Sequence, residues 1–268
     1  MRIAVIVTTY NRPDALDAVL QGYLAQRDND FEIVVADDGS TEETRKVVEH
    51  YRKVAPFPVT HVWQEDLGFR AAMCRNRAIA STDAPYLIFT DGDCIPSGDF
   101  VSAHRRLLEP GFFLSGNRIL LSESFTREVL ENKLRIGEWG FSKWLRARRS
   151  GGINRLLPLL GFPDFWRKME PEKWQGVKTC NLSAWRKDIM AVNGLDESYT
   201  GWGLEDSDLV IRLIRSGVRH KSARFSAPLF HLWHRENDRS RLEENRIMLE
   251  SILHSEQIRA NLGLDRYS

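Results

Sequence analysis

Short apolar runs alternate with stretches of helical periodicity over about the first 110 residues of this chain. Runs rich in valine and isoleucine predict strands at about 2–8, 31–36, 58–63 and 85–90. The stretches that follow them predict helices near 13–26, 41–53, 70–81 and 97–108. This alternation is typical of βαβ units and predicts an α/β fold with a mostly parallel, Rossmann-like sheet flanked by helices.

The pattern changes after this region. Residues 123–175 combine amphipathic helical patterns with many tryptophans and phenylalanines and a series of basic residues. From residue 176 the chain resumes with a strand-like segment at 179–183, an apolar helical pattern at 209–214 and a highly charged helical tail. At 268 residues the chain is long enough for one large domain or two small ones.

Composition narrows the class of protein. The chain has 38 basic and 37 acidic residues, and this balance predicts no nucleic-acid partner. Its three cysteines lack a C-x-x-C spacing, which argues against a disulfide framework or a zinc site. The apolar start is too short for a signal peptide, and no run of about 18 apolar residues occurs. We therefore expect a soluble, cytoplasmic protein that makes at most peripheral contact with a membrane.

Polar segments follow the predicted strands directly. They are Thr8-Thr9-Tyr10-Asn11, Asp37-Asp38-Gly39-Ser40 and Asp91-Gly92-Asp93. Ligands of open α/β sheets bind outside the carboxyl ends of the strands, so these segments should line one rim. The motifs G-x-G-x-x-G and G-x-x-x-x-G-K-[ST] are absent, which disfavours an NAD enzyme or a P-loop NTPase.

The pair Asp91 and Asp93 is the first candidate site. Two carboxylates one residue apart repel each other unless a cation or water separates them. Hard oxygen ligands on a short loop suit Mg²⁺ or Mn²⁺, which can bridge a carboxylate to a substrate diphosphate. Gly92 would allow close approach of a ligand to the backbone. The alternative is an exposed turn, because aspartate and glycine are common turn residues.

The segment 37–40 also has two interpretations. Acidic residues before a helix stabilise its N-terminus, and Ser40 is a candidate cap with Glu43 reaching back. Since one cap is enough, the surplus carboxylate could bind the ring N–H or the ribose hydroxyls of a nucleotide. Further along, the helix that follows Gly68 carries Arg75 and Arg77, which are either phosphate ligands or surface arginines.

Two later groups complete the candidates. Glu205 and Asp206 open a helix, where they either complement its dipole or supply a general base beside Trp202, on which a sugar ring could stack. Glycines on both sides of Trp202 predict a loop able to move over a ligand. His231 and His234 are either structural histidines or ligands that complete a Mn²⁺ shell.

In combination these motifs resemble a known family. The segments Thr9-Tyr10-Asn11-Arg12-Pro13, Asp37–Thr41 and Asp91-Gly92-Asp93 resemble the nucleotide-binding half of family 2 glycosyltransferases with the GT-A fold. The block 201–206 followed by His231-x-x-His234 is similar to the acceptor half of galactosyltransferase-like and chondroitin-polymerase-like enzymes. The resemblance implies one GT-A domain over 1–268, with a nucleotide-sugar-binding half (1–115), a helical aromatic and basic insertion (116–175) and an acceptor-binding and catalytic half (176–268).

The resemblance and the residue patterns together assign roles to individual residues. Nucleotide-sugar binding is expected of Thr9, Tyr10, Asn11, Arg12, Asp37, Asp38, Gly68, Arg75, Arg77, Asp91 and Gly92. Asp93, assisted by Asp91, would hold Mn²⁺ or Mg²⁺ together with His231 or His234. Asp206 would be the base, and Glu205 would orient the acceptor beside Trp202 and Gly203. One departure is Leu204, where the galactosyltransferase pattern has a second glycine.

The implied activity is metal-dependent, inverting transfer of a hexose or N-acetylhexosamine from a UDP-sugar to a hydroxyl of a glycan or lipid-linked glycan. The absence of the membrane anchor common in eukaryotic relatives indicates a bacterial enzyme of surface polysaccharide or lipopolysaccharide synthesis. The basic aromatic segment 141–166 is a candidate for peripheral membrane contact, or else a solvated helix packed on its own tryptophans. Two alternatives remain: a nucleotide-sugar-binding protein without turnover, and a sugar-phosphate nucleotidyltransferase.

Overall fold

A seven-stranded sheet forms the centre of the protein in a computed structural model that describes residues 1–161, 164–236 and 238–267. The strand order is β3-β2-β1-β4-β8-β6-β9. These strands are β1 (Ile3–Thr9), β2 (Phe31–Asp37), β3 (Val59–Trp63), β4 (Tyr86–Asp91), β6 (Phe112–Ser115), β8 (Asn181–Trp185) and β9 (Arg219–Ser222). Strands β3, β2, β1 and β4 run parallel, whereas β8 is antiparallel to both β4 and β6. The predicted mostly parallel α/β sheet is confirmed.

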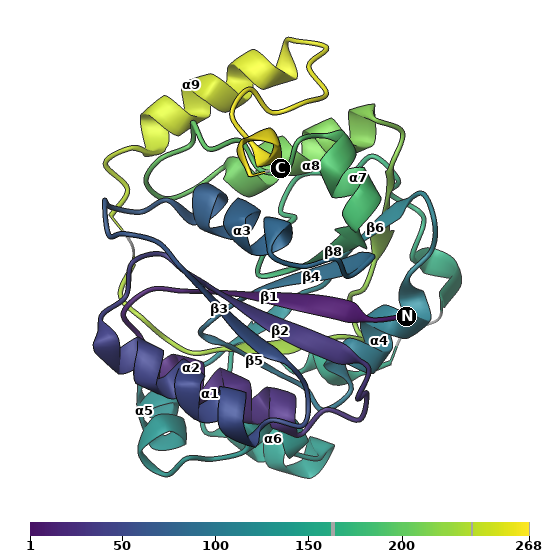
Figure 1. Cartoon of the computed structure of the whole chain (residues 1–268). Coiled ribbons are helices and arrows are strands. Elements are labelled where there is room, and N and C mark those ends of the chain that lie inside the picture. The colour runs from purple at the N-terminus through teal and green to yellow at the C-terminus, as the bar shows by residue number, and fades with distance from the viewer. Residues whose placement is uncertain (162–163, 237, 268) are drawn as a thin grey trace.

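Helices cover both faces of this sheet (Figure 1). On one face lie α1 (Pro13–Leu24) and α2 (Glu42–Val54), and on the other lie α3 (Ala71–Ala80), α7 (Arg186–Ala191) and α8 (Glu205–Arg215). Within β1, Ile3, Val5 and Val7 belong to the first core, and Ala4 and Ile6 belong to the second. Because both faces are buried, β1 is apolar at every position from Ile3 to Val7 instead of alternating with polar residues.

A smaller sheet extends the rim of the large one. Its order is β5-β10-β7, with β5 (Cys94–Pro96), β10 (Leu229–His231) and β7 (Arg118–Leu120). Strand β10 is antiparallel to β5, and His231 pairs with Cys94. This pairing brings His231 beside Asp93, although about 140 residues separate the two in sequence.

The remaining helices are α4 (Phe100–Leu107), α5 (Glu123–Glu131), α6 (Phe141–Arg149) and α9 (Leu242–Leu253). Trp144 on α6 is buried and stacks on Phe230 of β10 at 4.1 Å between ring centroids. This is the packing expected if the insertion folds onto its own tryptophans. Residues 162 and 163, which belong to the segment 141–166, lie outside the described residues.

Two predictions about local structure concern the charged tail and Ser40. The charged tail is helical, as predicted, and forms α9. The predicted capping role of Ser40 is wrong: Thr41 is the N-cap of α2, and its side chain makes no capping hydrogen bond. The Ser40 hydroxyl instead accepts a hydrogen bond from the backbone N–H of Asn11 at 2.9 Å. Ser40 therefore joins the loop after β2 to the loop after β1.

Among the described residues, no helix is both long and apolar enough to cross a membrane.

Candidate functional site

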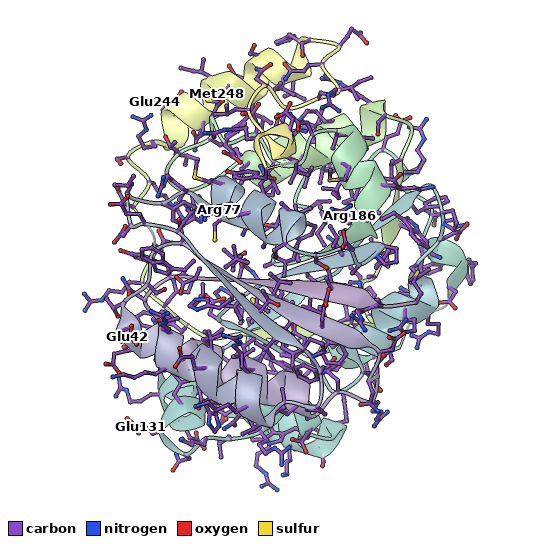
Figure 2. The ribbon with its side chains drawn as sticks, in the orientation of Figure 1. Glu42, Arg77, Glu131, Arg186, Glu244 and Met248 are labelled. Atoms are coloured by element: carbon purple, nitrogen blue, oxygen red, sulfur yellow. The ribbon has the colours of Figure 1, made fainter. Side chains whose placement is uncertain are left out.

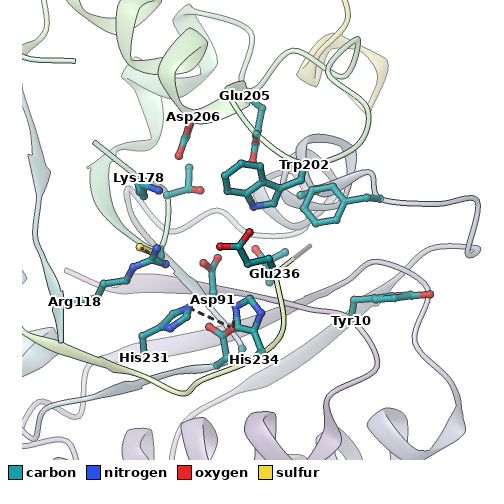
Figure 3. A pocket seen from close by; sticks show the side chains of 18 of the residues that line it. Tyr10, Asp91, Arg118, Lys178, Trp202, Glu205, Asp206, His231, His234 and Glu236 are labelled. Atoms are coloured by element: carbon teal, nitrogen blue, oxygen red, sulfur yellow. Dashed lines mark hydrogen bonds and ion pairs between the residues drawn. The ribbon is translucent and has the colours of Figure 1, made fainter. Parts of the chain in front are cut away.

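A cavity of about 1090 Å³ opens at the carboxyl ends of β1 and β4. Parallel pairing aligns these ends, with Thr8 opposite Asp91. The structure brings fifteen of the eighteen sequence-predicted site residues to its walls: Thr9, Tyr10, Asn11, Arg12, Asp38, Arg75, Asp91, Gly92, Asp93, Trp202, Gly203, Glu205, Asp206, His231 and His234. Figure 3 shows the side chains of several of them converging on one space.

Three predicted residues do not line this cavity. Asp37 is fully buried beneath the rim, where it accepts hydrogen bonds from the backbone N–H of Ser40 and interacts with His61 at 2.8 Å. Arg77 lies on α3 (Figure 2), and Gly68 lies in the preceding loop with a positive φ of 86°. Asp37 thus supports the shape of the loop, and the structure gives none of the three a place in the wall.

One end of the cavity is built around Asp38 and Tyr10. Asp38 is buried and accepts a hydrogen bond from the backbone N–H of Arg70 at 2.7 Å and one from the Gln64 amide at 2.5 Å. Burial raises the pKa of Asp38, and the hydrogen bonds oppose that shift. The Tyr10 ring is about half exposed, and its hydroxyl donates to Asp66 at 2.9 Å. This end therefore offers a flat ring beside a fixed carboxylate.

The centre of the cavity holds a cluster of candidate metal ligands. Oδ2 of Asp93 lies 3.4 Å from Nε2 of His234 and 3.7 Å from Nε2 of His231. Asp93, Cys94 and His231 place one ligand atom each within 4.8 Å of one another. Burial lowers the pKa of His231 to about 4, so this imidazole is neutral at pH 7 and can donate a lone pair. Carboxylate oxygen with neutral imidazole suits an ion such as Mn²⁺.

His234 is oriented by its backbone neighbour. Its Nδ1 lies 2.6 Å from the carbonyl oxygen of Arg235. Since a carbonyl can only accept, Nδ1 must carry the proton, and Nε2 of the neutral ring then carries a free lone pair. A hydrogen bond of this kind fixes the tautomer of metal-binding histidines. Both predicted histidines thus reach Asp93, and His234 is the one whose tautomer the structure determines.

Arg75 connects the two halves of the site. Its guanidinium contacts Asp91 at 3.2 Å, Glu205 at 3.0 Å and the Thr8 hydroxyl at 3.0 Å. Arg75 was predicted to be either a ligand of the nucleotide-sugar phosphates or a surface arginine; it is 5% exposed, so it is not a surface residue, and three protein groups contact its guanidinium. A buried bridge of this kind positions the carboxylates it contacts, so Arg75 holds the Asp91 loop and the start of α8 in register.

Asp206 faces the cavity from the first turn of α8. Burial, together with the negative charge of the adjacent Glu205, raises the pKa of Asp206 to about 7. Arg75 pairs with Glu205, whereas the carboxylate of Asp206 accepts a hydrogen bond from the backbone N–H of Ser207 at 2.8 Å and forms no ion pair within the described residues. A carboxylate with a pKa near the working pH is suited to act as a general base.

The loop before α8 is held in place by two features. Leu204 adopts a left-handed backbone with φ of 78°, which is unfavourable for a residue with a side chain and explains why glycine suits this position in the related pattern. The amide of Asn245 on α9 donates to the carbonyls of Thr200 and Gly203. These bonds hold the backbone on both sides of Trp202 in this structure.

The first half of the chain matches the sequence model of "Glycosyl transferase family 2" over residues 4–153, which is more than half of the chain. This chain belongs to glycosyl transferase family 2. Residues 163–235 of this family 2 chain match a second model, described as "N-terminal domain of galactosyltransferase". The two matches correspond to the two halves of the cavity wall and confirm the family that the motifs resemble.

Curated relatives of this family 2 chain include sugar transferases of different names. Validoxylamine A glucosyltransferase of Streptomyces hygroscopicus subsp. jinggangensis is 33% identical over 234 residues, covering 81% of this chain and 52% of that protein. Chondroitin synthase of Escherichia coli is 24% identical, covering 82% of this chain and 33% of that protein. The chain thus spans about half the length, or less, of these relatives.

Solved structures share the GT-A fold. TarS residues 1–349 of S. aureus in complex with UDP-GlcNAc has a TM-score of 0.67 and 16% identity, covering 100% of this chain and 69% of that one. The mannosyltransferase PcManGT of Pyrobaculum calidifontis, in complex with GDP-Man and Mn²⁺, has a TM-score of 0.61 and 19% identity, covering 95% of this chain and 65% of that one.

The cavity wall holds cationic residues that were not predicted from the sequence, and Arg118 and Lys178 are two of them. Neither belongs to a motif, because Arg118 opens an edge strand of the small sheet and Lys178 precedes β8. Only the fold places them beside Asp91 and Asp206 (Figure 3).

Proposed function

We propose that this family 2 domain transfers a hexose or N-acetylhexosamine from a UDP-sugar to a hydroxyl of a glycan acceptor. The observation that carries the proposal is the meeting, in one cavity, of the Asp93–histidine cluster with the carboxylate of Asp206. The names of the relatives and the UDP-GlcNAc and GDP-Man complexes of the structural neighbours support a nucleotide-sugar donor. The choice of uridine rests on the family resemblance.

Asp93 and His234 are the proposed ligands of a divalent ion, Mn²⁺ or Mg²⁺, with His231 and Asp91 beside them. Their carboxylate and imidazole donors fit such an ion, and the structural neighbour from Pyrobaculum calidifontis was solved with Mn²⁺. When bound, the ion neutralises negative charge on a diphosphate. Asp91 is held by Arg75, so its carboxylate keeps its position whether or not the ion is present.

Asp206 is the proposed base. It takes the proton from the acceptor hydroxyl as the hydroxyl oxygen bonds to the anomeric carbon and the bond to the UDP oxygen breaks. One displacement of this kind inverts the anomeric centre. Arg75 holds Glu205 beside Asp206, where burial and the neighbouring Glu205 carboxylate raise the pKa of the base.

The test is UDP release from a panel of UDP-hexoses and UDP-N-acetylhexosamines, with GDP-mannose included, in the presence and absence of Mn²⁺. Metal-dependent release from a UDP-sugar is the expected result, and the responding sugar names the donor. If the donor binds but no UDP is released with any acceptor tested, the chain is a nucleotide-sugar-binding protein instead. Release of pyrophosphate from UTP and a sugar phosphate would indicate the nucleotidyltransferase.

The two histidines should differ in their effect on metal binding. His234→Ala should weaken Mn²⁺ binding by roughly 10- to 100-fold, because it removes a lone pair aimed at Asp93. His231→Ala serves as the matched control and should weaken binding less. Titration of free Mn²⁺ by electron paramagnetic resonance, with UDP present, measures both. A larger loss in His231→Ala would reverse the assignment.

A lipid-linked acceptor is the proposed acceptor class, based on the insertion. Phe141, Leu157 and Leu160 are roughly half exposed there, and the exposed faces of α6 carry Lys143 and Arg149. Apolar side chains among cations favour the surface of an anionic bilayer. The protein should therefore float with phosphatidylglycerol vesicles and remain behind with phosphatidylcholine vesicles. Flotation that Phe141→Ser/Leu157→Ser leaves unchanged would contradict this surface.

A further inference from the structure

Arg118 and Lys178 are cations of the cavity wall that the proposed mechanism leaves without a role. Within the part of the chain that the structure describes, neither is paired with a carboxylate at ion-pair distance. The Arg118 guanidinium donates to the Sγ of Cys180 at 3.8 Å, and the Lys178 ammonium lies 6.0 Å from the Trp202 ring centroid. Both contacts are weak compared with an ion pair.

The fold holds these two side chains at defined positions. Arg118 is the first residue of β7 and pairs with Leu229 of β10. Its backbone carbonyl accepts a hydrogen bond from the Arg155 guanidinium at 2.8 Å. The carbonyl of Lys178 closes a turn with the N–H of Asn181 at the start of β8. Arg118 is therefore held in the cavity wall by the small sheet, and Lys178 by the hydrogen-bonded turn that leads into β8.

Their place in the cavity indicates what they could bind. Figure 3 shows both on the side of Asp91 away from Tyr10, with Lys178 near Asp206 and Arg118 near His231. They thus flank the space between the metal cluster and the base, where the sugar must lie during transfer. The carboxylates that attract Arg118, Asp91 and Asp93, belong to the metal cluster. A divalent ion there would take up their charge and leave the arginine without a counter-charge.

We propose that Arg118 and Lys178 form a subsite for an oxyanion of the donor, next to the sugar that is transferred. Arginine presents a planar fork that matches a phosphoryl or carboxylate group, and lysine adds a compact charge. The oxyanion has two possible sources: the β-phosphate of the leaving UDP, or a carboxylate on the sugar. The inference rests on the proposed nucleotide-sugar function and specifies the donor chemistry of the same site.

The experiment measures binding of UMP, UDP, UDP-glucose and UDP-glucuronate by calorimetry with Mg²⁺ present. UMP and UDP differ by the β-phosphate, and the two UDP-sugars differ by one carboxylate. The proteins are the parent, Arg118→Gln, Lys178→Gln and Arg118→Lys, and Arg52→Gln in the last turn of α2, exposed and outside the cavity wall, is the charge-matched control. Thermal unfolding of each variant checks that the fold is retained.

A β-phosphate subsite predicts that both glutamine variants lose roughly tenfold or more in affinity for UDP while UMP binding stays unchanged. A carboxylate subsite predicts that UDP-glucuronate binds the parent more tightly than UDP-glucose, and that the glutamine variants lose this difference. In either case Arg118→Lys should restore part of the affinity and Arg52→Gln should behave as the parent. Glutamine variants that bind all four ligands like the parent would overturn the subsite while leaving the proposed function standing. A parent protein that binds no UDP would overturn the proposed function, and the subsite with it.

Discussion

Replacing Asp206 by asparagine should lower kcat by about 10²- to 10⁴-fold, because it removes the general base while keeping the size of the side chain. The asparagine oxygen can still accept the N–H of Ser207, so the first turn of α8 should keep its structure. Donor affinity should stay within about twofold of the parent, since the base acts on the acceptor. UDP release and UDP-sugar binding, measured on the same preparations, separate these two effects.

The pH dependence of kcat/KM in the parent protein tests the role of Asp206 independently. Burial and the charge of Glu205 raise the pKa of Asp206 to about 7, so the carboxylate form that acts as base is the minor form below that pH. The value of kcat/KM should therefore rise with pH up to about 7 and level off above it. Asp206→Asn should lose this rise in its residual activity. A rise with the same midpoint in the variant would assign the titration to another group.

The stability of this variant is a further control. An aspartate whose folded-state pKa is raised above its unfolded value destabilises the fold once the pH exceeds the unfolded value, because the charged form is disfavoured in the folded state. Removing that charge should leave Tm at pH 8 unchanged or higher. A fall in Tm at pH 8 would mean that the activity loss reflects unfolding and says nothing about the base.

The predictable part of this structure is its first half, and the reason is local. The buried part of a strand such as β1 is apolar because both of its faces are covered. The chain becomes polar where the strand ends at the rim of the sheet. Parallel pairing then places Asp91 beside Thr8 whatever the helices do. This explains why Asp38, Asp91 and Asp93 could be assigned to one rim from the sequence.

The unpredicted part depends on contacts between distant segments. Nothing in the sequence near Arg75 indicates that its guanidinium would pair with Glu205, 130 residues later in the chain, and not with a phosphate. The predicted capping role of Ser40 was wrong for a similar reason, since the Ser40 hydroxyl accepts a hydrogen bond from the backbone N–H of Asn11 in the neighbouring loop. Arg118 was missed because an arginine at the start of a three-residue edge strand carries no pattern.

Asp93→Ala should be the second large effect, a loss of Mn²⁺ affinity of at least about 100-fold accompanied by a fall in activity of about 10²- to 10³-fold. Both histidines of the cluster point their Nε2 atoms at the same oxygen of Asp93, so this carboxylate is the point at which the ligand set converges. The negative charge of Asp93 also raises the pKa of Asp91, and its removal should stabilise the ionised form of Asp91. The metal-free variant should consequently be no less stable than the parent.

Asp99→Ala is the matched control for this substitution. It removes an exposed carboxylate paired with Arg27, outside the cavity wall. Paramagnetic titration of Mn²⁺ in the presence of UDP should give parent-like binding for Asp99→Ala and none in the measurable range for Asp93→Ala. Retention of tight Mn²⁺ binding by Asp93→Ala would remove the ion from this cluster. Charge neutralisation at the diphosphate would then have to come from side chains, and Arg118 and Lys178 are two wall cations that form no ion pair within the described residues.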